Sequence, residues 1–230
     1  FCSLFKGRND VFARRWYSKT SGKAGYQPVC QNEWTPLCDK RKYKCADCSN
    51  RQFSQLTYND YYRHLEGKDA DGRDVVGLYV LSEDNTCHLL CTDFDDKNCE
   101  HGYQDDVLAF VNVCRSWNVP YSIERSRSGN GAHVWIFFDS PVLAVKARKL
   151  GNAILTEAMN RNGKIGFKSY DRFFPNQDTL PEGGLGNLVA LPLQGNARKK
   201  GNSVFVNEFF EPYPDQWQYL LNVDKLSEQA

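Results

Sequence analysis

The feature that most constrains the fold is a pair of strand-length apolar runs that follow each other closely along the chain. These runs are Val75–Leu81 and Cys87–Phe94, and the polar residues Ser82–Thr86 separate them. Short apolar runs bounded by turn-forming residues are typical of buried strands. The spacing therefore predicts a β-hairpin with a short loop.

Helical and strand-like patterns alternate over the rest of the chain. Apolar residues recur at helical spacing in residues 104–118 and 141–160, and Pro120 ends the first of these helices. Shorter helices are expected at Asp60–Leu65 and Asp215–Val223. Five further runs are strand-like: Tyr121–Arg125, Ala132–Phe138, Lys168–Phe174, Asn187–Leu193 and Ser203–Val206. This mixture predicts an α+β (mixed α/β) fold rather than a regular array of parallel strands and helices.

Composition excludes several classes of protein. A hydrophobic content of 41% and an aromatic content of 13% provide enough apolar surface for a packed core. No apolar run approaches the roughly 18 residues of a membrane-spanning helix, and no signal-peptide pattern opens the chain. Because the first residue is Phe1 and not Met, we expect a piece of a longer protein. The expected location is the cytoplasm of a prokaryote.

The net charge of +1 conceals a basic N-terminal quarter. Residues 1–52 contain 11 Lys and Arg against four Asp and Glu, whereas the rest of the chain contains 18 against 24. A basic stretch of this kind suggests a polyanionic partner. The acidic remainder suits divalent metal binding, and it equally suits a solvated surface.

The segment Leu89–Asp95 is an apolar strand that ends in two carboxylates. Alternate residues of a strand point to one face, so Asp93 and Asp95 should project side by side while Phe94 packs on the opposite face. Two adjacent carboxylates repel each other unless one is protonated or a cation lies between them. Mg²⁺ and Mn²⁺ suit such oxygen ligands. Taken alone, the pair also fits a strand that ends in a solvated turn.

The loop Ser126–Gly131 joins two predicted strands and is rich in groups that bind anions. Gly129 and Gly131 permit a positive φ and allow backbone N–H groups to face a phosphate. A histidine at the start of the next strand can donate a hydrogen bond to a phosphate oxygen. The candidate side chains are Arg127, Ser128, Asn130 and His133. The alternative is an ordinary hairpin turn with a satisfied histidine.

Nine cysteines, no signal peptide and an odd count argue against a secreted disulfide scaffold. Four of them cluster: Cys30, Cys38, Cys45 and Cys48. Zn²⁺ is commonly held by four thiolates in closed structural sites. The cluster therefore predicts a structural zinc module, resembling a zinc knuckle, at residues 30–48. Unliganded core cysteines and a redox CxxC pair are the alternatives.

Basic and aromatic residues near this cluster suggest contact with a nucleic acid. The segment Phe12–Tyr17 combines rings that stack on bases with cations that bind phosphates. It equally fits an amphipathic helix in which Phe12 and Trp16 pack inward. The candidate nucleic-acid contacts are Arg14, Arg15, Trp16, Lys42 and Lys44.

The acidic pair, followed downstream by SGNGAH entering another strand, resembles the archaeo-eukaryotic primase superfamily. The strings GRDVVGLYVL, ERSRSGNGAHVWIFF, SYDRFFPNQD and GNLVALPLQ are similar to one branch of it. That branch contains the primase domain of TOTE-type conflict systems and the CRISPR-associated primase-polymerases. The resemblance extends from Phe5 to about Leu220.

The resemblance implies a metal-dependent, template-directed nucleotidyltransferase that starts or extends primers from dNTPs or NTPs. Its template would be single-stranded DNA or RNA, and its core two packed units with an RRM-like sheet. Asp93, Asp95 and Asp171 would bind Mg²⁺ or Mn²⁺, with Asp178 as an alternative third carboxylate. Further nucleotide contacts are implied at Gln194, Arg198 and Lys199, in a loop that equally fits a solvated turn. Further domains of the same polypeptide are implied partners.

We therefore expect a basic N-terminal segment with a cysteine module at residues 1–66 and a catalytic core at residues 67–225. Two other classes of function stay open. Three carboxylates alone would permit a metal-dependent nuclease, although the anion-binding loop favours a nucleotide substrate. The basic segment and the cysteine module alone would permit a non-catalytic module that binds single-stranded nucleic acid.

Overall fold

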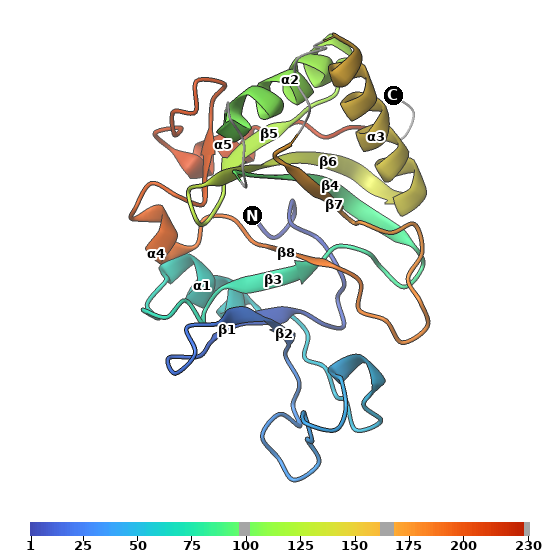
Figure 1. The fold of residues 1–230 in the computed structure, drawn as a ribbon, viewed down its shortest axis with the longest axis vertical. Coiled ribbons are helices and arrows are strands. Elements are labelled where there is room, and N and C mark those ends of the chain that lie inside the picture. The colour runs from blue at the N-terminus through green and yellow to red at the C-terminus, as the bar shows by residue number, and fades with distance from the viewer. Residues whose placement is uncertain (97–101, 162–167, 228–230) are drawn as a thin grey trace.

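The computed structural model describes residues 1–96, 102–161 and 168–227, which form two antiparallel sheets (Figure 1). One sheet has the order β2-β1-β3-β8 and consists of β1 (Ala13–Tyr17), β2 (Ala24–Pro28), β3 (Val76–Tyr79) and β8 (Leu188–Ala190). The other has the order β7-β4-β6-β5-β9 and consists of β4 (Thr86–Asp95), β5 (Ser122–Arg125), β6 (Gly131–Leu143), β7 (Tyr170–Phe174) and β9 (Val204–Val206).

Helices cover the outer side of the five-stranded sheet and one edge of the molecule. In Figure 1, α2 and α3 lie over the five-stranded sheet, and the four-stranded sheet lies on its other side. The helices are α1 (Tyr58–Glu66), α2 (Gly102–Ser116), α3 (Ala144–Arg161), α4 (Gly195–Arg198) and α5 (Gln216–Leu221), with a 3₁₀ turn at Cys45–Asp47. This architecture confirms the predicted α+β class. Among the described residues, no helix combines the length and apolar character that crossing a bilayer requires.

The N-terminal segment contributes to the main core. Phe5 is fully buried and makes edge-to-face contacts with Trp135 and Phe137 of β6, with ring centroids 5.2 and 5.3 Å apart. Such contacts stabilise a core beyond the burial of apolar area. Strand β1 belongs to the expected N-terminal segment, residues 1–66, and pairs with β3, which belongs to the expected catalytic core, residues 67–225. These two parts of the chain therefore share one sheet.

The predicted hairpin of Val75–Leu81 with Cys87–Phe94 is wrong, although both runs are strands. β3 pairs with β1 and β8, whereas β4 pairs with β6 and β7. Each strand has a hydrogen-bonded neighbour on both sides, so neither lies at a sheet edge. The turn between the runs therefore carries the chain from one sheet to the other.

The helical interpretation of Phe12–Tyr17 is also wrong, because residues 13–17 form β1. Phe12 is buried, whereas Trp16 keeps 37% of its surface exposed and its ring lies over β2. A Cβ atom at Gly25 would lie 2.9 Å from that ring, so the indole packs directly against the backbone of β2.

A buried histidine joins α1 to both the four-stranded sheet and the segment after it. His64 has no exposed surface; its Nδ1 accepts a hydrogen bond from the Val76 N–H at 3.1 Å, and its Nε2 lies 2.9 Å from the Pro192 carbonyl oxygen. This pairing requires the neutral ring with the proton on Nε2. Burial lowers the pKa of His64 to about 4.

We predict that acid destabilises the fold through His64. In the unfolded chain the imidazole has a pKa near 6.5, so below that pH the unfolded state binds a proton that the folded state excludes. Stability from this residue is fully present above about pH 6.5 and falls by on the order of 3 kcal/mol towards pH 4. Urea unfolding between pH 4.5 and pH 7 measures this slope. The His64→Gln variant should have a shallower slope, and an unchanged slope would contradict the prediction.

Candidate metal centre and anion pocket

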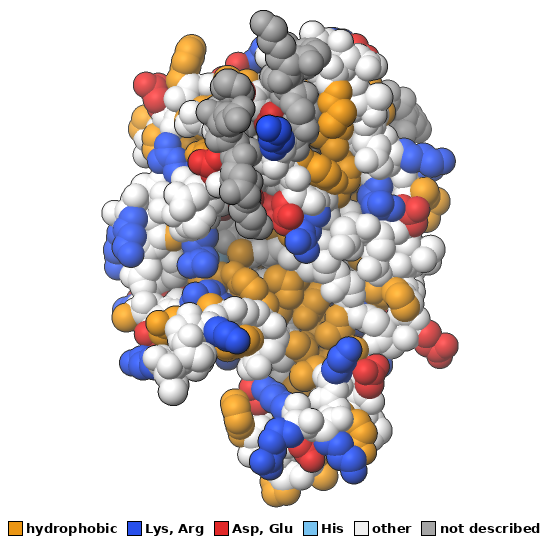
Figure 2. Space-filling model, viewed as in Figure 1, with side chains coloured by type: hydrophobic (Ala, Val, Ile, Leu, Met, Phe, Trp, Pro, Cys, Tyr) orange, Lys and Arg blue, Asp and Glu red, His pale blue; other side chains and the backbone are white. Residues whose placement is uncertain are grey.

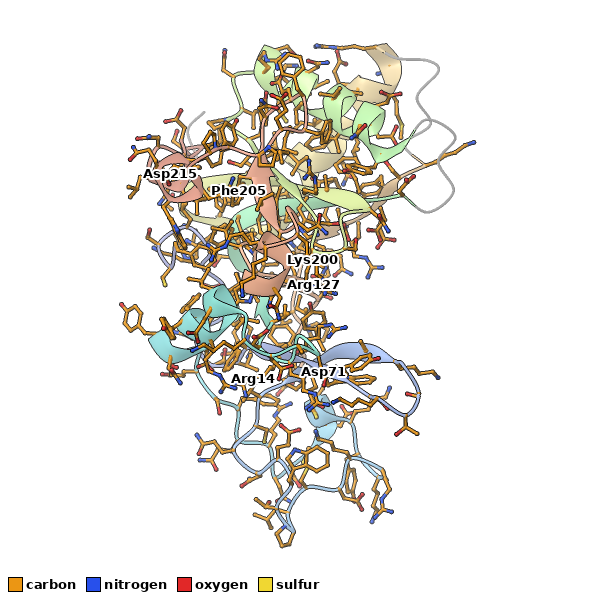
Figure 3. All side chains as sticks on the ribbon, turned by 90° about the vertical axis from the view of Figure 1, so that its left-hand side faces the viewer. Arg14, Asp71, Arg127, Lys200, Phe205 and Asp215 are labelled. Carbon is orange, nitrogen blue, oxygen red and sulfur yellow. The ribbon has the colours of Figure 1, made fainter. Side chains whose placement is uncertain are left out.

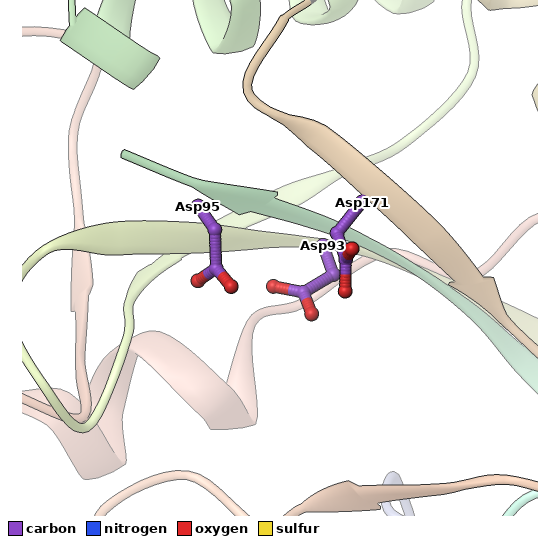
Figure 4. Close-up of side chains that lie close together, drawn as sticks. All are labelled: Asp93, Asp95 and Asp171. Carbon is purple, nitrogen blue, oxygen red and sulfur yellow. The ribbon is translucent and has the colours of Figure 1, made fainter. Parts of the chain in front are cut away.

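Three carboxylates converge at the end of β4, an interior strand of the five-stranded sheet. Asp93 and Asp95 alternate along β4, and Asp171 lies on the adjacent strand β7 (Figure 4). Each offers one oxygen, and these three oxygens lie within 4.8 Å of one another. Across the described ranges, no other group of three or more His, Cys, Asp or Glu residues meets this spacing. Phe94 points away and is fully buried, with its ring 5.8 Å from that of Phe110 in α2.

The electrostatics of this trio favour a cation. Burial raises the pKa of Asp93, and the neighbouring carboxylates of Asp95 and Asp171 raise it further, whereas His133 and Arg172 oppose them. The Arg172 Nε lies 2.8 Å from an Asp171 carboxylate oxygen and offsets part of the negative charge. Closely spaced carboxylate oxygens are the donors that Mg²⁺ and Mn²⁺ prefer, so the residues present fit such an ion.

The alternative third carboxylate, Asp178, lies outside this trio. It follows β7 in the connection to β8 and forms an ion pair with Arg148 of α3. The structure therefore brings Asp171, and not Asp178, beside Asp93 and Asp95.

His133 faces the trio and is held in place by a buried glutamate. It lies opposite Asp93 in the β4–β6 pairing, with its Nε2 3.5 Å from an Asp93 carboxylate oxygen. On its other side, its Nδ1–H donates to Glu124 at 2.9 Å. Burial by itself would lower the pKa of His133, but Glu124, followed by Asp93 and Asp95, raises it to about 9. These neighbours favour the protonated, cationic ring, whose Nε2 faces Asp93.

Glu124 was not among the site residues predicted from the sequence. The residue is only 1% exposed, and its carboxylate also accepts hydrogen bonds from the Trp135 Nε1–H at 3.0 Å and the Ser203 hydroxyl at 3.3 Å. A signal was available, because a charged residue inside an apolar strand needs a partner. The hairpin pairing of β5 with β6 places Glu124 directly opposite His133.

Glycines allow the β5–β6 loop to approach the end of β4. A Cβ atom at Gly131 would lie 2.3 Å from the Phe94 carbonyl oxygen, so no other residue fits there. The Asp96 N–H donates to the Asn130 carbonyl oxygen at 2.9 Å and ties the loop to the strand end. Ser128 is exposed, and its hydroxyl lies 3.0 Å from that of Ser126 and accepts the Asn130 N–H at 3.2 Å.

A basic pocket of about 320 Å³ lies on the side of the molecule where this loop meets the four-stranded sheet. We call it the anion pocket, and its polar lining includes Arg15, Asp71, Arg127, Asn196 and Lys200. Figure 3 shows Arg127 and Lys200 close together on this side, above Asp71. The Asp71 carboxylate is itself paired with Lys19 at 3.5 Å and Arg73 at 3.3 Å. Three cations from separate parts of the chain therefore surround a cavity whose one lining carboxylate is already neutralised.

Three residues predicted to contact the nucleotide are Gln194, Arg198 and Lys199. The first two form hydrogen bonds within the chain, and Lys199 lies outside the anion pocket. The Gln194 side chain borders the anion pocket, but its amide donates to Asp74 at 2.9 Å and its oxygen accepts the Ala197 N–H at 2.9 Å. Arg198 turns away and donates to the Leu65 carbonyl oxygen at 3.2 Å. Lys199 is exposed and does not line the pocket, whereas its neighbour Lys200 does.

The predicted nucleic-acid contacts occupy two regions. Arg14 forms an ion pair with Asp60 of α1 at 2.8 Å, and Arg15 reaches the anion pocket, where it donates to the Asp71 carbonyl oxygen. Lys42 lies over the ring of its neighbour Tyr43, with its Nζ 5.3 Å from the ring centroid. Lys44 is exposed just before the 3₁₀ turn.

The four clustered cysteines line one small cavity of about 30 Å³. They are Cys30, Cys38, Cys45 and Cys48, and each is a half-buried free thiol. In the described part of the chain, their sulfur atoms do not form a group within 4.8 Å of one another as the carboxylate oxygens do. The structure thus brings the cysteines together around a cavity but does not show a closed zinc site.

Comparison with known families agrees with this geometry. The whole chain, residues 1–230, matches the family described as the archaeo-eukaryotic primase domain of the TOTE conflict system, and the chain belongs to that family. A comparison with curated proteins finds no match. Membership in this family implies a nucleotidyltransferase of the primase-polymerase type, and the carboxylate trio could hold its metal ion.

Proposed function

We propose that this domain is a template-directed primase-polymerase that adds nucleotides from dNTPs or NTPs to a primer on single-stranded DNA or RNA. The observation that carries the proposal is the carboxylate trio, because it lies directly beside a cationic histidine and a glycine loop. A nuclease would use a similar trio. The adjacent loop and anion pocket favour a nucleoside triphosphate as the substrate.

In this proposal the chain positions reactants and provides no nucleophile. Asp93, Asp95 and Asp171 would hold Mg²⁺ or Mn²⁺, and such ions stabilise the attacking and leaving oxygens of an in-line displacement. The primer 3′-hydroxyl would attack the α-phosphate, and pyrophosphate would leave. His133 would donate its Nε2–H to a phosphate oxygen, while Glu124 fixes the orientation of the ring.

We further propose that the five-stranded sheet is the RRM-like unit of a two-unit core. The order β4-α2-β5-β6-α3-β7, with the spatial order β7-β4-β6-β5, supports this interpretation. It is the strand–helix–strand–strand–helix–strand pattern of ferredoxin-like units. The four-stranded sheet would be the second unit.

We predict that Asp93→Ala and Asp95→Ala each abolish incorporation of labelled nucleotides on a primed template with Mn²⁺ or Mg²⁺. Each change removes a carboxylate that would bind the ion, and it also relieves repulsion within the trio. The melting temperature without divalent ions should therefore stay the same or rise. Normal incorporation by either variant would refute the proposal. A wild-type chain that binds strands but incorporates nothing would support the non-catalytic binding module.

We also propose that the anion pocket receives the triphosphate of the nucleotide. Arg127 belongs to the loop that ends at Gly131, and Gly131 pairs with Asp95 at the carboxylate trio. Lys200 and Arg15 complete the cationic lining. Charge-assisted hydrogen bonds from such groups to phosphate are worth roughly 1.5–3 kcal/mol each.

We expect Arg127→Ala and Lys200→Ala each to raise the KM for nucleotide about tenfold or more, the effect of losing one such bond. The matched control is Lys199→Ala, which removes the same charge one residue away but outside the pocket. Steady-state incorporation at varied nucleotide concentration measures the effect. Equal KM values for the Lys199 and Lys200 variants would contradict this placement of the triphosphate.

For the cysteine module we propose a structural Zn²⁺ site formed by Cys30, Cys38, Cys45 and Cys48. Their convergence on one cavity supports it, and the described cysteines are all free thiols, as expected in a reducing cytoplasm. Elemental analysis of protein purified with zinc present should give one zinc per chain. Replacement of Cys45 by Ser should remove it, and zinc-free wild-type protein would refute the site.

A further inference from the structure

A cysteine-rich lobe projects from the body of the molecule on the side away from α2 and α3 (Figure 1). We define the cysteine lobe as residues 30–53. Its two ends are joined by a bridge between Cys30 and Phe53 and by a hydrogen bond from the Gln31 N–H to the Gln52 carbonyl oxygen at 2.8 Å. The lobe is therefore anchored at its base, and its outer turns face solvent.

Trp34 in this lobe is 84% exposed. Its φ of +67° lies in the left-handed region, which bulky residues rarely occupy. The Lys40 Nζ lies over the ring, 4.7 Å from its centroid. An indole gains little by lying in water, and local backbone strain of this kind points to a functional constraint. Trp34 therefore has the properties of a binding residue.

The chemistry around Trp34 favours one class of partner. Tyr43 is half-exposed and lies under Lys42, and the exposed cations Arg41 and Lys44 belong to the same stretch. Cations interleaved with exposed rings bind single-stranded nucleic acid, because rings stack on bases while cations contact phosphates. A purely hydrophobic protein-docking patch would not need this charge.

A hydrophobic surface connects the lobe to the side of the molecule that carries the carboxylate trio. Tyr26, Phe53, Leu185 and Leu188 are half-buried around Val11, Ala13 and Tyr79 on one face of the four-stranded sheet. Figure 2 shows hydrophobic side chains gathered over the middle of this face, between the lobe below and the five-stranded sheet above. Figure 4 shows the carboxylates of Asp93, Asp95 and Asp171 side by side, and all three project away from the strands that carry them.

We propose that the single-stranded template crosses this hydrophobic surface between the carboxylate trio and the cysteine lobe, where a base stacks on Trp34. Lys42 and Lys44 contact the phosphates beside that base. The path of the template to the carboxylate trio rests on the proposed polymerase function. The stacking contact itself does not require catalysis.

Binding of a labelled single-stranded 20-mer, as DNA and as RNA, tests the proposal without nucleotide or divalent ion. Stacking on one ring is worth roughly 1–3 kcal/mol, so Trp34→Ala should weaken binding about tenfold. Trp34→Phe retains a ring and should restore most of the affinity. The matched control is Phe209→Ala, because Phe209 is also 84% exposed but lies after β9, outside the surface. Lys42→Ala should lower the slope of affinity against salt by about one, whereas Trp34→Ala should leave that slope unchanged.

Equal affinity of the Trp34→Ala and wild-type proteins for both DNA and RNA would overturn the proposal and indicate a protein partner for the lobe. A loss that Trp34→Phe does not restore, with a lowered melting temperature, would also overturn it, because the ring would then act in folding. Nucleotide-incorporation assays run in parallel distinguish a failure of the proposed template path from a failure of the proposed polymerase function. If Trp34→Ala binds normally while wild-type protein polymerises, only the template path fails. If Trp34→Ala loses binding while wild-type protein never polymerises, only the enzymatic proposal fails.

Discussion

The repulsion among three carboxylates at the end of β4 is the interaction around which the rest of the site is arranged. β4 lies between β6 and β7, so its last residues are flanked on both sides by residues of neighbouring strands. Asp171 adds a third negative charge from β7, and His133 and Arg172 supply the nearest positive charge. The folded chain concentrates negative charge here at a cost in stability, which a divalent ion would offset.

The surrounding structure holds this site rigidly. Glu124 is itself buried and paired, and it orients His133 from behind. Gly131 brings the β5–β6 loop against the backbone of β4, so the anion-binding groups and the carboxylates share one framework. The second sheet contributes Arg15 to the anion pocket, so the two sheets meet where the triphosphate is proposed to bind.

Local patterns predicted most of the elements after residue 57, because strand and helix periodicity depends on neighbours in sequence, but they did not predict β1, β2 or α4. The side-by-side placement of Asp93 and Asp95 followed from the two-residue period of a strand. Strand partners did not follow, and the predicted hairpin of β3 with β4 was wrong, because a buried apolar run shows that both faces of a strand are covered but not which strands pair with it. The hydrogen bonding of Gln194 could not be predicted for a similar reason. Its amide donates a hydrogen bond to Asp74, which is 120 residues away in the sequence, and no local sequence pattern indicates such a contact.

The most direct test of the central claim is a crystal structure of the chain with Mn²⁺ and a non-hydrolysable dNTP, measured for the anomalous signal of manganese. The account predicts a manganese peak coordinated by oxygens of Asp93, Asp95 and Asp171, with the phosphates near His133 and Arg127. Asp178 should remain outside the coordination sphere. Manganese bound elsewhere, with the trio free of metal in the presence of nucleotide, would contradict the account.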